Sequence, residues 1–199
     1  MFGRIGSKRM KGVSLKGFIK DSKVIVYKKA NPYWRAFLAN GYGKDHGEYI
    51  ELHPVEALYL INTGKLEVLR DDETVPHDDL FMLFSRKKEN LWELYTIYKD
   101  LRSKGFIILV SDDQLLPFLM LPKGSTVFDN EPFAAIMIAE SFRAIKLEEL
   151  AKAVEKCKEK NRKLIIAIMD EIGDITYYTA EVEEKLETEV TLKIFRKGG

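Results

Sequence analysis

Residues 95–106 read YTIYKDLRSKGF, and this stretch decides the fold of the second half of the chain. Upstream of Gly105, apolar side chains follow the spacing of one helix face: Leu91, Leu94, Tyr95, Tyr98 and Leu101. Because glycine commonly ends helices, the helix is predicted to stop at Gly105. Residues 106–110 then form a continuous apolar run, which is typical of a strand buried on both faces. The sequence therefore predicts a helix that turns directly into a central strand.

Further apolar runs beyond residue 110 predict a sheet. Residues 115–121 contain Pro117, so this run is expected to be an edge strand or to carry a bulge. Other strands are expected at residues 133–139, 164–169 and 175–182. A last run, at 190–195, either extends an interface or folds back on its own domain. A helical stripe precedes residue 164, formed by Leu147, Leu150, Ala151, Val154 and Cys157. Residues 89–199 are thus predicted to form an α/β domain with a mixed central sheet.

The first half, residues 1–88, is predicted to be a small α+β domain. Residues 13–27 read as a hairpin that turns at residues 20–23. Asn31 precedes Pro32, the pattern of a helix cap followed by proline at the first helical position. Residues 71–79 are expected to be an acidic loop that contains His77. The domain boundary is placed at the basic residues 86–88.

Composition excludes several classes of protein. A net charge of +1 argues against a protein that coats nucleic acid, although a local basic patch is compatible with RNA contact. The single cysteine, Cys157, excludes an intrachain disulfide and a cysteine metal cluster. The longest apolar runs are too short to span a bilayer, and the N-terminus lacks the apolar core of a signal peptide. We therefore expect a cytoplasmic protein that does not contact a membrane.

No metal or cofactor motif is evident, and none is expected. The histidines, His46, His53 and His77, do not follow a metal-ligand spacing, and His53 before Pro54 indicates a helix entrance. Basic residues crowd the end of the helix that precedes residue 164. They either complement the helix dipole or form a patch that faces phosphate. These basic residues are Lys152, Lys156, Lys158, Lys160, Arg162 and Lys163.

Three stretches together resemble the tRNA-intron (tRNA-splicing) endonuclease family. Residues 41–68 contain Gly-Tyr-Gly-Lys, then LHPVEALYL, then GKLEV, and are similar to the N-terminal pattern of that family. Residues 95–106 resemble the motif that opens its C-terminal nuclease-like domain. A weaker match covers residues 162–170 with 175–178. The matches occur in the family's order and extend over residues 34–182.

The resemblance implies a chemistry that needs no metal. In the family, a tyrosine is the general base on the 2′-hydroxyl, a histidine is the general acid, and a lysine stabilises the charged transition state. The implied products carry a 2′,3′-cyclic phosphate and a 5′-hydroxyl. Lys163 matches the lysine. However, no tyrosine lies between Tyr98 and Tyr177, and no histidine follows His77. The chain is therefore predicted to lack catalytic residues of its own.

The resemblance also implies an assembly. An acidic turn at Asp170, Glu171 and Asp174, which in the family enters a basic cleft of a neighbouring subunit, is expected to bind a partner. The strand at residues 175–182, with Tyr177 and Tyr178, is expected to be an edge strand that pairs subunits.

These features predict an archaeal-type structural subunit in a heterotetramer with two catalytic chains. The chain is expected to position the bulge–helix–bulge of precursor tRNA, and the predicted RNA-binding residues are Lys156, Arg162 and Lys163. Two alternatives remain open from the sequence. One is a self-sufficient nuclease that uses Tyr177 or Tyr178 with Lys163. The other is a stand-alone RNA-binding or scaffold protein.

Overall fold

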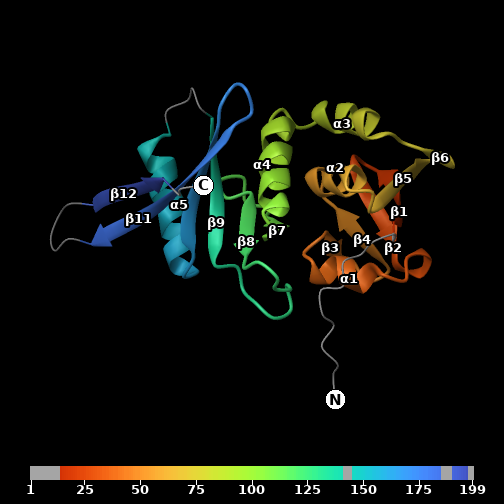
Figure 1. The fold of residues 1–199 in the computed structure, drawn as a ribbon, viewed down its shortest axis with the longest axis horizontal. Helices are drawn as coiled ribbons and strands as arrows, with labels where there is room; N and C mark the ends of the chain where they lie inside the picture. The colour runs from red at the N-terminus through yellow and green to blue at the C-terminus, as the bar shows by residue number, and fades with distance from the viewer. Residues whose placement is uncertain (1–13, 141–144, 185–189, 197–199) are drawn as a thin grey trace, which may run out of the picture. The chain divides into compact units, whose positions relative to one another are not determined.

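The structure is a computed structural model that describes residues 14–140, 145–184 and 190–196 (Figure 1). The chain divides into two compact units, Met1–Tyr95 and Thr96–Gly199. Each unit contains a six-stranded sheet with both parallel and antiparallel neighbours. The mixed α+β fold class is therefore confirmed. The division into domains 1–88 and 89–199 stays a prediction.

The first unit is built on a sheet with strand order β3-β4-β2-β1-β5-β6. Only the β1–β5 pair is parallel among its described pairs. Its elements are β1 (Leu15–Lys20), β2 (Lys23–Tyr27), η1 (Lys28–Ala30), α1 (Trp34–Ala39), β3 (Lys44–Asp45), β4 (Tyr49–Leu52), α2 (Pro54–Asn62), β5 (Leu66–Arg70), β6 (Glu73–Thr74) and α3 (His77–Ser85).

Helix α2 covers one face of this sheet. Its buried side chains, including Leu58 and Leu60, pack with the buried residues of the sheet, such as Val26 and Val68. His53 caps the helix as the sequence predicts, because its side chain accepts a hydrogen bond from the Val55 N–H.

One buried carboxylate connects α2 to the Gly-Tyr-Gly turn. Glu56 is only 3% exposed, and it accepts hydrogen bonds from the His53 N–H at 2.8 Å and the Gly43 N–H at 3.0 Å. Gly43 has φ of +73°, and a Cβ there would lie 2.4 Å from the Ile50 side chain. The turn therefore requires glycine for its conformation and for its close approach to β4.

The second unit has strand order β12-β11-β10-β9-β8-β7. Strands β9 and β10 are parallel and are connected through α5, whereas the other described neighbours are antiparallel. The elements are α4 (Leu91–Ser103), which spans the division between the units, β7 (Ile107–Val110), β8 (Phe118–Leu121), β9 (Ala134–Glu140), α5 (Leu147–Glu159), β10 (Lys163–Met169), β11 (Ile175–Glu184) and β12 (Val190–Arg196).

Two helices use opposite faces of this second sheet (Figure 1). Alternation along β10 divides its side chains between the faces. Leu164 and Ile166 join a core with Ala153 and Cys157 of α5. On the other face, Phe118 of β8 contacts the ring of Tyr98 in α4, with the ring centroids 5.7 Å apart. The predicted helix-to-strand stretch is thus confirmed as α4 followed by β7.

Two expectations for the first unit are wrong. Asn31 does not cap a helix, because α1 begins at Trp34 with Tyr33 at the N-cap. Its buried side chain instead bonds the backbone of Lys16 and Tyr27. The expected loop at residues 71–79 contains β6 and the first turn of α3, which starts at His77.

Two expectations for the second unit are also wrong, both about which strand lies at an edge. Strand β8 begins only after Pro117 and lies between β7 and β9, so the proline interrupts no ladder. Strand β11 is not an edge strand, since β12 pairs with it from Tyr178 to Glu184. The run at 190–195 therefore folds back on its own domain.

We expect Glu56→Ala to destabilise the first unit. The change leaves two backbone N–H groups without this acceptor, and such losses total about 2–4 kcal/mol of unfolding free energy. Urea denaturation followed by tryptophan fluorescence measures this loss, because both tryptophans, Trp34 and Trp92, lie in that unit.

The control is Glu48→Ala at an exposed turn, which should change stability by no more than about 0.5 kcal/mol. Equal losses for the two variants would contradict the role of the buried carboxylate.

Candidate functional site

Three strand ends meet at one edge of the second sheet. Met120, near the end of β8, pairs with Ala134, at the start of β9. Ala134 also pairs with Lys163, at the start of β10. The Phe133 N–H donates to the Met120 carbonyl at 3.0 Å, and the Lys163 N–H donates to the Phe133 carbonyl at 2.9 Å. The register thus brings together the three segments in which the family resemblance implies a tyrosine, a histidine and a lysine.

The side chains at this edge provide positive charge. Lys163 is exposed, and Lys123, two residues beyond β8, lies 4.8 Å from the centre of the Phe106 ring. Leu121 is fully buried, and residues 130–132 are Asn, Glu and Pro. Among the described residues of these segments, no phenol or imidazole is present. The edge can therefore attract an anion but offers neither a tyrosine base nor a histidine acid.

The other two predicted RNA-binding residues, Arg162 and Lys156, have different surroundings. Arg162 is half-buried, and its Nε has no hydrogen-bond partner among the described residues. Lys156, on α5, places its Nζ 2.5 Å from Asp113 Oδ2. The hydrogen bond from Lys156 lowers the pKa of the Asp113 carboxyl. Lys156 is therefore already engaged by an acidic side chain of its own unit.

The acidic turn is organised around one of its own carboxylates. Asp170 Oδ1 accepts hydrogen bonds from the N–H groups of Ile172, at 3.1 Å, and Asp174, at 2.8 Å. The side chains of Glu171 and Asp174 are exposed, and Ile172 is 84% exposed. Asp170 thus builds the turn, whereas the other two carboxylates face solvent.

The two tyrosines of β11 lie on opposite faces of the sheet. Tyr178 packs against the α5 core. Tyr177 donates a hydrogen bond from its hydroxyl to Asp100 Oδ2 at 2.6 Å, and Lys104 lies 4.7 Å from its ring centre. Burial, with the Asp100 carboxylate second, raises the pKa of the Tyr177 phenol well above its usual range. Tyr177 is therefore a fixed hydrogen-bond donor in this unit.

Comparison with known proteins identifies the family. Residues 15–81 match the family model described as tRNA intron endonuclease, N-terminal domain, and residues 91–177 match the catalytic C-terminal domain. A tRNA-splicing endonuclease of Pyrococcus horikoshii is 30% identical over 142 residues, which are 71% of this chain and 81% of that relative. This chain belongs to the tRNA intron endonuclease family. The resemblance inferred from the three motifs is confirmed.

Other relatives differ in length. A tRNA-splicing endonuclease of Methanothermobacter thermautotrophicus is 25% identical over 159 residues, which are 80% of this chain and 92% of the relative. That of Methanococcoides burtonii is 30% identical over 161 residues, which are 80% of this chain but 44% of the relative. The chain thus spans less than half of the Methanococcoides protein.

The geometry does not favour Tyr177 or Tyr178 as a substitute base for a tRNA intron endonuclease reaction at Lys163. Tyr177 pairs with Ala167, four residues along β10 from Lys163. At a rise of about 3.3 Å per residue, the two positions are about 13 Å apart. Tyr178 lies on the opposite face. In addition, a phenol with a raised pKa forms little phenolate near neutral pH.

Sequence reasoning missed three contributors to this region of the family fold. Asp100 holds both Tyr177 and Lys104, Asp113 holds Lys156, and Lys123 adds charge over the Phe106 ring. Only the first gave a signal, since Asp100 and Lys104 have the i, i+4 spacing of a helical ion pair. The other two depend on contacts between distant segments.

Neither a metal cluster nor a membrane span occurs in the described residues. They contain no group of three or more histidine, cysteine or acidic side chains that could hold a metal ion. In the same part of the chain, no helix has the length and apolar character needed to cross a membrane.

We expect Tyr177→Phe to lower the free energy of unfolding by about 1–2 kcal/mol, because it removes a partly buried hydrogen bond to a carboxylate. Urea denaturation followed by circular dichroism measures the change. Tyr178→Phe is the matched control and should alter stability by less than about 0.5 kcal/mol. Losses of similar size in the two variants would contradict the proposed contact.

The same phenol predicts a pH effect. Because its pKa is higher in the folded chain, the unfolded chain releases this proton first, and stability should fall as pH rises above about 10. Tyr177→Phe should show a smaller loss of stability between neutral pH and pH 11 than the unaltered protein. An identical pH dependence would exclude this contribution.

Proposed function

We propose that this chain is the structural subunit of a tRNA-splicing endonuclease. It assembles with a catalytic subunit, two copies of each, and helps to position the bulge–helix–bulge of precursor tRNA. In this proposal the catalytic subunit makes the cut, leaves a 2′,3′-cyclic phosphate and a 5′-hydroxyl, and acts in the cytoplasm.

The observation that carries the proposal is the composition of the sheet edge around Lys163. The strand register keeps three segments adjacent, yet the segments contain no tyrosine or histidine. Loss of a positioned general acid lowers the rate by about 10²–10⁴, and loss of a general base lowers it by a similar factor. A chain that keeps the fold but supplies neither group fits a supporting role better than a catalytic one.

The acidic turn supports a contact with a partner. Glu171 and Asp174 present two negative charges beside the exposed Ile172. An apolar side chain flanked by carboxylates is suited to a cleft that is apolar at its base and basic at its rim. Tyr177 and Tyr178 of β11 form the second proposed contact. Residues 175–177 precede the part of β11 that pairs with the described part of β12.

The RNA contact is proposed at Arg162 and Lys163, with a weaker contribution from Lys156. Lys163 is exposed at the sheet edge, and the guanidinium of the half-buried Arg162 precedes it on the chain. Guanidinium and ammonium groups bind phosphate oxygens well. To bind a phosphate, Lys156 must first break its ion pair with Asp113.

The central test is cleavage of a bulge–helix–bulge RNA by the purified chain. We expect no cleavage by the chain alone, and cleavage after addition of a co-purifying endonuclease subunit that carries the missing tyrosine and histidine. Mass spectrometry of a native pull-down identifies that subunit.

Two outcomes would overturn the proposal. Cleavage by the chain alone, lost in Lys163→Ala, would indicate a self-sufficient nuclease. RNA binding with no endonuclease subunit in the pull-down would indicate a scaffold protein.

The assembly is tested by charge reversal at the two solvent-facing carboxylates. We expect Glu171→Lys with Asp174→Lys to weaken binding to the catalytic subunit at least tenfold, because each like-charge contact costs about 1 kcal/mol or more in a partly buried interface. Elution volume of the mixture and titration calorimetry measure the effect. Asp170 is left unchanged, since its carboxylate holds the turn.

The matched control reverses two exposed acidic residues of the first unit, Glu48→Lys with Glu73→Lys. It changes net charge by the same amount and should leave the affinity intact. If both double variants bind the partner equally, the turn is not the docking element.

A further inference from the structure

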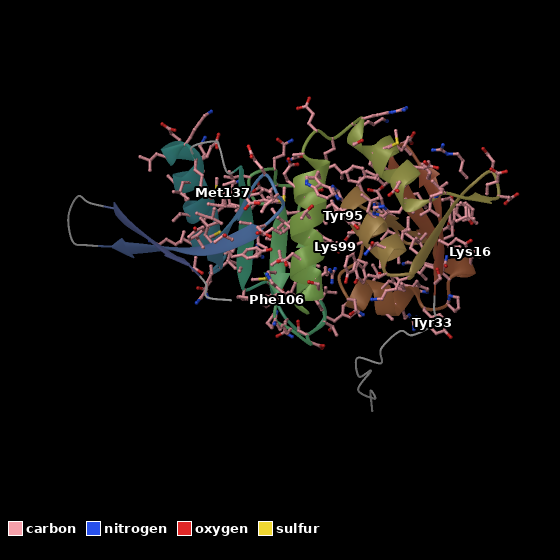
Figure 2. All side chains as sticks on the ribbon, turned by 45° about the horizontal axis from the view of Figure 1, so that its top comes forward. Lys16, Tyr33, Tyr95, Lys99, Phe106 and Met137 are labelled. Atoms are coloured by element: carbon pink, nitrogen blue, oxygen red, sulfur yellow. The ribbon has the colours of Figure 1, made fainter. Side chains whose placement is uncertain are left out.

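One face of the first sheet carries aromatic side chains where a solvent-facing sheet normally carries polar ones. Alternation places Leu15, Gly17 and Ile19 of β1 on the face covered by α2. Lys16, Phe18 and Lys20 therefore lie on the opposite face, which we call the open face (Figure 2 labels Lys16). Ile25 of β2 pairs with Phe18 and therefore lies on the same face.

Four rings cross the open face in a row. The ring centres of Phe18 and Tyr27 are 6.0 Å apart, and those of Tyr27 and Tyr49 are 6.3 Å apart. His46, in the turn before β4, stacks on Tyr49 at 5.1 Å with an angle of 11° between the ring planes. The row therefore runs from β1 across β2 to β4 without a gap between neighbouring rings.

The rings are accessible, yet their support is rigid. Phe18 is 37% exposed and Tyr27 is 46% exposed, whereas Ile25, which pairs with Phe18 and precedes Tyr27 on β2, is only 5% exposed. Asn31 fixes the backbone of β1 and β2 beneath the row. Its side chain donates to the carbonyls of Tyr27, at 2.7 Å, and Lys16, at 3.1 Å, and accepts from the Lys16 N–H at 2.8 Å. The aromatic surface is thus held in place before any ligand arrives.

Exposed lysines lie beside the first ring of the row. Lys16 and Lys20 flank Phe18 on β1 and are exposed. Three acidic side chains near the row have partners: Glu51 accepts from Lys23 and Asp45 accepts from Lys28, both at 2.5 Å, while Glu67 accepts from Thr74. Glu48, beside Tyr49 in the sequence, is exposed. Lys16 and Lys20 therefore suit contact with the phosphates of a polyanion.

We propose that the open face binds single-stranded RNA by stacking unpaired bases on Phe18, Tyr27 and Tyr49, while Lys16 and Lys20 contact phosphates. Unpaired bases stack on aromatic rings presented by a sheet, and extended single strands separate their bases by distances close to the spacing of this row. This site lies in the first unit and is additional to the proposed contacts at Arg162 and Lys163. It does not depend on a catalytic partner.

Fluorescence anisotropy of the full-length chain with a fluorescein-labelled ten-nucleotide oligouridylate tests the proposal. Phe18→Ala with Tyr27→Ala should weaken binding at least tenfold, since loss of stacking on one ring typically costs about 5- to 150-fold. A ten-base-pair RNA duplex should bind more weakly than the oligouridylate, because its bases are paired. Circular dichroism of the double variant checks that the fold is retained.

The matched controls are Phe128→Ala and Met82→Ala, which remove other exposed apolar side chains, 72% and 58% exposed, and should leave the affinity unchanged. Lys16→Ala with Lys20→Ala should reduce the slope of log K against log salt by about 1.4, because each phosphate that a lysine neutralises on a single strand adds about 0.7 to that slope.

Three results would overturn the inference. The first is unaltered oligouridylate affinity in the Phe18 and Tyr27 double variant. The second is equal affinity for single- and double-stranded RNA, which would indicate charge alone. The third is a dimer of the unaltered chain in light scattering and a monomer of the same double variant, which would assign the open face to a second copy of the chain. Failure of the pull-down with a catalytic subunit would leave this inference standing, because the binding assay contains no partner.

Discussion

The second unit depends on one buried cation. Arg102 is only 7% exposed, and its guanidinium donates from Nε to the Tyr98 hydroxyl at 3.0 Å and from Nη2 to the Ile108 carbonyl at 2.8 Å. A guanidinium is stable in such surroundings only when its donors are paired. These bonds fix α4 to β7, and Asp100 on the same helix reaches β11 through Tyr177. Helix α4 is therefore bonded to two separate strands of the sheet, β7 and β11.

The register of the sheet does not depend on the side chains that a catalytic site requires. Backbone hydrogen bonds align Met120, Phe133 and Lys163, and buried apolar residues hold the strands on both faces. A tyrosine or a histidine at this edge would add little to that alignment. A member of the tRNA intron endonuclease family can therefore lose the acid and the base while it keeps the surfaces around them, which is how a supporting subunit would arise from an active one.

The sequence predicted those features that depend on local chemistry. Helical spacing located α4, Gly105 located its end, and His53 before Pro54 located the start of α2. It failed where distant residues compete. Asn31 has the local pattern of a cap, but bonds to Lys16 and Tyr27 draw its side chain to the sheet. Likewise, nothing near residues 175–182 reveals that β12 covers β11. The sequence nominated candidate site residues by their type. The ion pair of Lys156 with Asp113 and the hydrogen bond from Tyr177 to Asp100 became visible only in the tertiary structure.

The acidic turn illustrates why a residue type alone does not define an interface. Three carboxylates lie within five residues, and the sequence treats them alike. In the structure, Asp170 Oδ1 accepts hydrogen bonds from two backbone N–H groups of its own turn, so this oxygen is used internally. Gly173, with φ of +89°, lets the chain reverse so that Asp174 returns to bond with Asp170. The solvent-facing charge of the turn is therefore that of Glu171 and Asp174, and the internal bonds hold the backbone of the turn. In the proposed docking, a turn held in this way would lose less conformational entropy than a flexible loop of the same charge.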